Sequence, residues 1–330
     1  MNQNIQISIV IPVYNRGAAV AGTLETCFAQ QGVAMEIIVV DDASTDGTRK
    51  VLEGYGEKIR LIALEESHGN GTFARTAGLR AARGDFVKFL DHDDILEPGT
   101  LAEELAIARS ESADLVMSGW GVLDLDSEGR GVEGSERRYE PPEVDRVVEA
   151  IFGEGKTPFT AAVLYRRSLV ADMEWDSEAA LYDDFDWFAR AALRARRIAR
   201  RDGLAYWWRR GATSYQAGVG AGPLSYFHAE KTRCLVYRKV EDALRDSGGL
   251  GPERTALLLR RYYVGLRAFA RWDPEFCRGI LGRMRRLAPG WVPGRSSEPS
   301  PAVRGAIRVL GLGLFLKAYA AVRCVVKPAP

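Results

Sequence analysis

The first 90 residues alternate between short β-branched runs and segments with helical spacing, and this alternation restricts the fold more than any other feature. The apolar runs at residues 5–14, 35–41, 59–64 and 86–90 have the length of buried strands. Helical segments of similar length separate them. Strands that alternate with such helices form a parallel sheet wound by right-handed crossovers. The sequence therefore predicts an α/β fold with a Rossmann-like, mostly parallel sheet flanked by helices.

Acidic turns follow two of these strands. Asp42 comes directly after the run 35–41, and Asp91, Asp93 and Asp94 come directly after the run 86–90. Because the carboxyl ends of parallel strands meet at one edge of a sheet, we expect both turns at the edge where such folds bind ligands. In extended chain the Asp91 and Asp93 carboxylates point the same way, and each raises the other's pKa unless a cation neutralises them. The predicted cofactor is Mg²⁺ or Mn²⁺, which prefer oxygen ligands.

Each feature also has a simpler explanation by itself. A solvated acidic turn accounts for residues 91–94 about as well as a metal site does. Asp42 has the residue type of a helix cap, and Tyr14 has that of a core residue. Taken together, the two turns fit a nucleotide and its metal. Asp42 would then accept hydrogen bonds from a base or ribose, and Tyr14 would stack on the base.

Four segments occur in the order and spacing of family 2 glycosyltransferases, and the chain resembles that family over about residues 6–215. The segments are SIVIPVYNR, VVDDASTDGT, FARTAGLRAARGDFVKFLDHDD and YDDFDWFARAAL. The resemblance implies a GT-A fold and an enzyme that transfers a sugar, with inversion, from a nucleotide-diphospho-sugar to an acceptor hydroxyl. We expect a UDP-linked donor, metal dependence and a role in surface polysaccharide or glycolipid synthesis.

The resemblance also implies a donor site. The residues expected to hold the nucleoside are Pro12, Tyr14 and Asp42. Arg75 would lie near the diphosphate. Asp91 and Asp93 would form the metal and ribose motif, with Asp93 as the direct metal ligand and Asp91 nearer the ribose. Thr76 departs from the family pattern, in which asparagine often follows the arginine.

The expected general base lies further along the chain. In the family it is the second acid of a Glu-Asp pair, and that position is Asp184, preceded here by Asp183. Arg209 and Arg210 belong to a later segment and are candidates to neutralise diphosphate charge. Gly211 stands where the family frequently has histidine, so we expect no histidine ligand there.

Two other functions are also consistent with parts of the sequence. Gly69, Gly71 and Ala74 match the dinucleotide fingerprint G-x-G-x-x-A after a strand, which is typical of an NAD-type Rossmann oxidoreductase. That function leaves Asp93 and the first acidic turn unexplained. The second alternative is a non-catalytic scaffold protein that binds sugar nucleotides, but binding alone does not require a base such as Asp184.

The last quarter of the chain differs from the rest in charge. Residues 251–330 contain fifteen Lys or Arg and four Asp or Glu, about +11, which leaves about −10 for residues 1–250. No family resemblance extends past about residue 226. We therefore predict a catalytic domain and a helical, basic C-terminal region, with boundaries as follows: nucleotide-sugar side 1–120, acceptor side 121–225, C-terminal region 226–330.

The last apolar helix is predicted over residues 303–326. It is long enough to cross a bilayer, but Arg308, Lys317 and Arg323 make crossing costly. Two interpretations remain: a helix that lies on an anionic membrane surface, or one that packs on protein, including a second subunit. The expected partners are a nucleotide-sugar donor and a carbohydrate or lipid-linked acceptor, without nucleic acid.

The remaining features bear on location and on the acceptor side. The four cysteines have no metal or redox spacing, and the first residues lack the basic segment of a signal peptide, so we expect a cytoplasmic protein, peripheral on the inner membrane face. The polar residues 124–142 are predicted to form an irregular loop over the site. Trp120 is either a sugar-stacking residue or packing.

Overall fold

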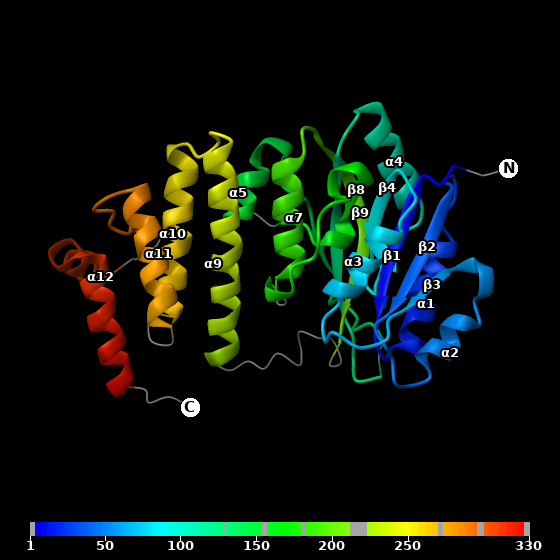
Figure 1. Ribbon diagram of the computed structural model, residues 1–330, viewed down its shortest axis with the longest axis horizontal. Helices are drawn as coiled ribbons and strands as arrows, with labels where there is room; N and C mark the ends of the chain where they lie inside the picture. Colours follow the sequence, from blue (N-terminus) through cyan, green and yellow to red (C-terminus); the bar gives the residue numbers. More distant parts are fainter. Residues whose placement is uncertain are drawn as a thin grey trace. The chain divides into compact units, whose positions relative to one another are not determined.

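The computed structural model describes residues 4–128, 130–153, 157–179, 182–211, 223–269, 273–295 and 300–326. The chain divides into two compact units, residues 1–218 and residues 219–330 (Figure 1). Our predicted boundary lies a few residues later, at 225/226. The division of the first unit into donor and acceptor sides remains a prediction.

A mixed sheet organises the first unit. The described strands are β1 (Ile7–Val13), β2 (Met35–Asp41), β3 (Arg60–Ala63), β4 (Phe86–Phe89), β5 (Ile95–Leu96), β6 (Leu115–Asp124), β7 (Arg137–Tyr139), β8 (Val163–Arg166) and β9 (Ile198–Arg210). Their order in the sheet is β3-β2-β1-β4-β8-β6-β9-β5, with β7 paired to β6. The first four strands are mutually parallel, as are β6 and β9. This architecture confirms the predicted fold class.

Strand β1 is buried on both faces, which explains why all of its residues except Ser8 are apolar. On one face Ile9 and Ile11 join a core cluster with Leu24 of α1 (Gly17–Phe28) and Leu105 of α4 (Thr100–Ser110). On the other face Val10 packs against α3 (Thr72–Ala81). A Cβ at Gly78 of α3 would lie 2.3 Å from the Val10 Cγ1 atom, so only glycine allows this close approach.

The turns after β1, β2 and β4 lie at one edge of the sheet because these strands are parallel neighbours. Their backbones take conformations that few side chains adopt: Asn15 has φ 51° and Ala43 has φ 58°. The Asn15 side chain joins the first two turns, since its Oδ1 accepts a hydrogen bond of 2.8 Å from the Thr45 amide. These contacts fix the edge on which the site is built.

Shorter helices complete the first unit. The α-helices are α2 (Thr48–Glu53), α5 (Val147–Ile151), α6 (Arg167–Val170) and α7 (Asp183–Arg194), and the 3₁₀ helices are η1 (Gly56–Lys58), η2 (Val144–Arg146), η3 (Thr160–Ala162) and η4 (Ser177–Ala179). β8 lies antiparallel between β4 and β6, so the segment that leads into it, η3, reaches the end of β4. α7 packs against η3 and α5. This insertion brings residues from the second half of the unit to the acidic edge.

The described part of the polar stretch 124–142 consists mostly of turns and irregular backbone, as expected for a loop, but one part of it is a strand. Its residues Arg137–Tyr139 form β7, which pairs antiparallel with the end of β6. Trp120 is 2% exposed and stacks on Tyr139, with ring centroids 5.5 Å apart. Trp120 is therefore a packing residue, because its ring is covered by β7 and has no face open to a sugar.

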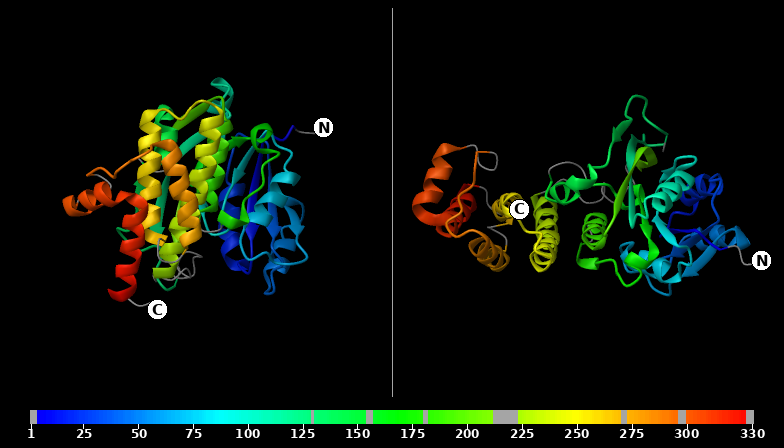
Figure 2. Two further views of the ribbon diagram at one scale, coloured as in Figure 1. Left: turned by 60° about the vertical axis from the view of Figure 1, so that its left-hand side comes forward. Right: turned by 90° about the horizontal axis from the view of Figure 1, so that it is seen from above.

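The second unit consists of helices in the part that the structure describes: α9 (Pro223–Asp246), α10 (Pro252–Phe269), α11 (Pro274–Leu287) and α12 (Pro301–Val326). Adjacent helices α9, α10 and α11 pack against one another (Figure 2). Asp273 caps α11 by accepting a hydrogen bond of 2.9 Å from the Phe276 amide. Within the described ranges, no helix combines the length and the apolar character needed to cross a membrane.

The predicted last helix is not a continuous one. α12 contains a residue with non-helical backbone angles, Gly311 (φ 72°, ψ 152°), and the helical parts on either side of it run in different directions (Figure 2). A single apolar face along residues 303–326 is therefore ruled out. The side chains of residues 317–326, including Lys317 and Arg323, lie outside the described part of the structure.

Candidate active site

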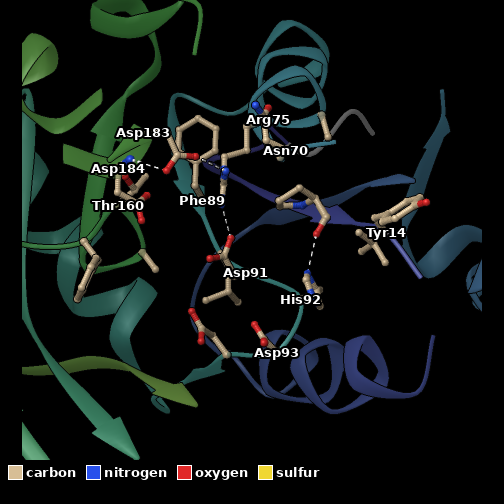
Figure 3. A pocket seen from close by; sticks show the side chains of 18 of the residues that line it. Tyr14, Asn70, Arg75, Phe89, Asp91, His92, Asp93, Thr160, Asp183 and Asp184 are labelled. Carbon is tan, nitrogen blue, oxygen red and sulfur yellow. Dashed lines mark hydrogen bonds and ion pairs between the residues drawn. The ribbon is translucent and has the colours of Figure 1, made fainter. Parts of the chain in front are cut away.

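A cavity of about 310 Å³ lies at the carboxyl edge of β1, β2 and β4. All seven residues that the sequence singled out as site residues line it: Pro12, Tyr14, Asp42, Arg75, Asp91, Asp93 and Asp184. Tyr14 and Asp184 lie at opposite ends, with Arg75 and Asp91 between them (Figure 3). Their roles are not established by this placement, but residues up to 172 positions apart share one cavity.

Two consecutive aspartates at the end of β2 have different environments. Asp41 is fully buried, and its carboxylate accepts hydrogen bonds from Arg49 Nε at 2.8 Å and from the Ser44 amide at 3.1 Å. Asp42 points to the cavity instead, where it accepts a bond of 3.0 Å from Ser67 Oγ. Successive side chains of a strand point to opposite faces, so one acid supports the turn and the other faces the ligand space.

Arg75 of α3 links the acidic turn to the helix that carries the predicted base. Its Nη2 atom is 2.6 Å from Asp91 Oδ1, and its Nη1 atom is 3.0 Å from Asp183 Oδ2 (Figure 3). The guanidinium also lies over the Trp175 ring, 4.7 Å from its centroid. Burial raises the pKa of Asp91, but the charges of Arg75 and His92, together with the hydrogen bond from Arg75, outweigh burial and hold that pKa below its usual value.

The other two acids of the turn differ from Asp91. Asp93 lines the cavity, and burial raises the pKa of its carboxyl. Asp94 is 2% exposed, and burial together with Asp91 and Asp93 raises its pKa well above the ordinary value. Its Oδ1 atom is buried without a hydrogen-bond partner among the described residues. Burial and the neighbouring carboxylates therefore both oppose the ionisation of Asp94.

The donor set of this turn suits a hard divalent cation. Asp91 has one carboxylate oxygen left beside its bond to Arg75, and no ion pair to the Asp93 carboxylate occurs within the described ranges. Over the same ranges no three His, Cys, Asp or Glu side chains are placed to hold a metal by themselves. A cation here would need oxygens from a substrate, as Mg²⁺ and Mn²⁺ commonly take from phosphates.

Asp184 is the second residue of α7. Its amide donates a 3.1 Å hydrogen bond to Asp183 Oδ1, and its side chain lies beside Thr160 (Figure 3). Burial, with a smaller contribution from the neighbouring Asp183, raises the pKa of Asp184 to about 7. A carboxyl group with this pKa exchanges protons near neutral pH, which is the property required of a general base.

Some lining residues were not identified from the sequence. Phe159, Thr160 and Trp208 form part of the wall near Asp184, and the Phe159 and Trp208 ring centroids are 5.4 Å apart. They lie before β8 and late in β9, and no local pattern marks them. The long antiparallel connection through β8 brings them here. Phe159 and Trp208 lie far apart in the sequence, so the only signal for them is that both are aromatic, and this signal is weak.

The two arginines near the end of β9 have different surroundings. Arg209 donates from Nε to the backbone carbonyl of Asp93. Arg210 pairs with Asp124 at 2.7 Å on the surface and does not line the cavity. Of these two arginines, Arg209 alone therefore lies near the acidic turn.

The dinucleotide fingerprint at Gly69–Ala74 occupies an unsuitable place for an oxidoreductase. It follows β3, which lies at the end of the strand order. In a dinucleotide-binding fold the glycine-rich turn follows the first strand at the centre of the sheet, where the strand order reverses. Here the centre is occupied by β1 and its Pro12–Arg16 turn instead.

Comparison with known proteins agrees with this geometry. The family described as "Glycosyl transferase family 2" matches residues 8–172. The succinoglycan biosynthesis protein ExoO of Rhizobium meliloti is 35% identical over 121 residues, which are 36% of this chain and 34% of that protein. The poly(ribitol-phosphate) beta-N-acetylglucosaminyltransferase TarS of Staphylococcus aureus is 29% identical over 210 residues, 62% of this chain and 35% of that protein. The matches thus span about a third of the length of these relatives.

Solved structures share the fold. S. aureus TarS 1–349 in complex with UDP-GlcNAc superimposes with a TM-score of 0.62 at 19% identity, covering 96% of this chain and 88% of that one. The mannosyltransferase PcManGT from Pyrobaculum calidifontis, in complex with GDP-Man and Mn²⁺, gives a TM-score of 0.53 at 17% identity, covering 99% and 89%. At these identities the likeness establishes the fold only. The match to the family over half of the sequence establishes more: this chain belongs to glycosyl transferase family 2.

Proposed function

We propose that this protein is an inverting glycosyltransferase that uses a UDP-linked sugar and a divalent metal ion. The observation that carries the proposal is the convergence of Asp42, Asp93 and Asp184 on one cavity. A protein that only binds sugar nucleotides has use for the first two acids and none for the third. The UDP-GlcNAc complex of TarS, a protein with the same fold, supports the choice of donor.

The nucleoside would occupy the end of the cavity formed by Pro12, Tyr14 and Asp42. Tyr14 is 43% exposed, which leaves a ring face free to stack on a base. The diphosphate would lie over the acidic turn, where Asp93 and the remaining oxygen of Asp91 would hold Mg²⁺ or Mn²⁺. Such an ion neutralises the negative charge that develops on the departing diphosphate.

The acceptor would enter at the other end, beside Phe159 and Trp208. Asp184 would take the proton of the acceptor hydroxyl as the acceptor oxygen forms its bond to the anomeric carbon. The bond from that carbon to the diphosphate breaks on the opposite side, so the configuration inverts and UDP leaves. The names of the relatives, in succinoglycan and poly(ribitol-phosphate) chemistry, support a carbohydrate polymer or a lipid-linked precursor as acceptor.

The donor site is tested by thermal unfolding with UDP, GDP and CDP sugars, each with and without Mn²⁺. We expect the correct donor to raise the melting temperature most, because a ligand stabilises the state that it binds, and we expect Mn²⁺ to increase that shift. Asp93→Ala should remove the Mn²⁺-dependent part and leave the ligand-free melting temperature unchanged. Asp85→Ala, at an exposed aspartate before β4, is the matched control. A metal-dependent shift of full size in Asp93→Ala would refute this role.

A further inference from the structure

Exposed apolar side chains gather on one short stretch of the second unit. The structure describes only a few large hydrophobic side chains as exposed, and most are scattered singly over the first unit. Three lie within six residues of α12: Val309 is 84% exposed, Leu314 is 57% exposed and Leu310 is 44% exposed. Single exposed hydrophobic residues are ordinary, whereas a cluster marks a surface that contacts something apolar.

The backbone presents these residues at a corner. Gly311 interrupts the helix with angles that only glycine adopts without strain, and a Cβ placed there would meet nothing within 4 Å. Val309 and Leu310 precede the break and Leu314 follows it, so these residues belong to helical segments that run in different directions (Figure 2). We call residues 308–314 the α12 corner.

The sequence around the α12 corner is rich in basic residues, and two of them, Arg308 and Arg285, are described close to the corner. Residues 276–326 contain nine Lys or Arg and one Asp or Glu. The Arg308 side chain lies in the corner itself, and Nη2 of Arg285, from α11, would lie 2.9 Å from a Cβ at Gly313. A groove between α11 and α12 is lined by both apolar and basic side chains. Its lining includes Met284, Arg285, Trp291, Arg308, Leu310 and Leu314.

We propose that the α12 corner docks on the surface of an anionic lipid bilayer, with its apolar side chains at the level of the upper acyl chains and its arginines at the head-group phosphates. Peripheral proteins are held on such surfaces by two contributions: the insertion of apolar side chains, and the attraction of clustered Lys and Arg to anionic lipids. Trp291 in the groove fits the same boundary, because an indole ring has an apolar body and one polar N–H group.

A protein partner fits this surface less well. A stable protein interface buries about 800 Å² on each side. The α12 corner exposes only three large apolar side chains, which is a small apolar area for such an interface. A bilayer needs no complementary shape, so a few inserted side chains and long-range charge attraction are sufficient. This inference does not depend on the identity of the donor or acceptor.

The test uses the full-length protein and vesicles of phosphatidylcholine, alone or mixed with phosphatidylglycerol. We expect sedimentation with the mixed vesicles at low salt, little with the neutral ones, and release as salt screens the charges. Val309→Ser/Leu314→Ser should weaken binding on the order of tenfold or more, from the apolar area that no longer leaves water. Val132→Ser/Val144→Ser, at two valines of the first unit that are each 42% exposed, is the matched control and should bind as the wild type does.

Charge is tested separately. Arg308→Gln should weaken binding about fivefold, the effect of one basic residue at an anionic surface, and reduce its salt dependence. Arg109→Gln, at an exposed arginine of α4, should not. Because the changed side chains are exposed, melting temperatures should stay the same. Failure of the wild type to bind mixed vesicles at low salt would overturn the proposal. So would lipid binding that survives Val309→Ser/Leu314→Ser, or lipid-free self-association that these changes abolish.

Discussion

At the scale of single residues, the site depends on how neighbouring acids are paired. Asp183 and Asp184 are adjacent, yet only Asp183 contacts Arg75, at 3.0 Å. Asp183 in turn raises the pKa of Asp184 by its negative charge, in addition to the larger effect of burial. The first acid of the pair therefore joins α7 to α3, and under the proposed function the second is the carboxylate that accepts a proton.

The raised pKa of Asp184 predicts a pH dependence. A base acts in its ionised form, and the Asp184 carboxyl loses its proton near pH 7, so kcat/KM for transfer should rise tenfold per pH unit below that pH and level off above it. Asp184→Asn should lose about a hundredfold or more in rate and show no such rise, while its donor-induced thermal shift stays normal. Asp85→Asn serves as the control. An Asp184→Asn enzyme that retains the wild-type pH profile would assign the base elsewhere.

At the scale of elements, β4 is held in place by a buried ion pair. Lys88 of β4 and Glu104 of α4 are both fully buried, with Lys88 Nζ 2.7 and 2.8 Å from the two carboxylate oxygens. Ser118 of β6 donates a further bond of 2.8 Å to Glu104. Since β4 leads directly into Asp91 and Asp93, this cluster joins the acidic turn to a helix and to the far half of the sheet.

We expect the two halves of this pair to be strongly coupled. Lys88→Met leaves a buried carboxylate without its partner and should lower the free energy of unfolding by about 3–5 kcal/mol. Lys88→Met/Glu104→Leu removes both charges and should recover most of that loss, because well-packed apolar groups replace a buried ion pair at little cost. Urea unfolding followed by circular dichroism measures both. Additive losses in the double variant would show that the pair is not coupled.

At the scale of the whole molecule, chemistry and charge are distributed over different units. Every described residue that lines the candidate active site belongs to residues 1–218, whereas the basic excess belongs to residues 251–330. Under the two proposals above, the first unit would bind the donor and the second would contact a membrane surface.

Hydrogen exchange tests this division in the intact protein. UDP with Mn²⁺ should slow amide exchange in peptides that cover residues 12–17, 42–48 and 90–94, because ligand binding stabilises the segments that form the cavity. Exchange in α10 and α11 should be unchanged, and these helices serve as the internal control. Donor-dependent protection of α10 as large as that of the acidic turn would contradict a donor site confined to the first unit.

The sequence by itself determined the parallel core and its acidic edge. β1 to β4 were predictable because each carries a mostly apolar run bounded by turn residues, and short-range patterns of this kind decide strand formation locally. The prediction that Asp42 and Asp91 share one edge followed from parallel strand geometry alone. Resemblance to the family supplied the positions of Arg75 and Asp184, which composition and spacing do not distinguish from ordinary surface residues.

Tertiary structure decided the rest. The bond between Arg75 and Asp183 joins residues 108 positions apart, and it exists because β8 inserts antiparallel between β4 and β6. The β7 strand forms from a polar segment because β6 offers it free backbone groups. Likewise, the apolar residues around Gly311 do not predict the non-helical backbone angles that interrupt α12 there. Local sequence patterns encode which segments become strands or helices, whereas pairing between distant segments depends on the whole packed chain.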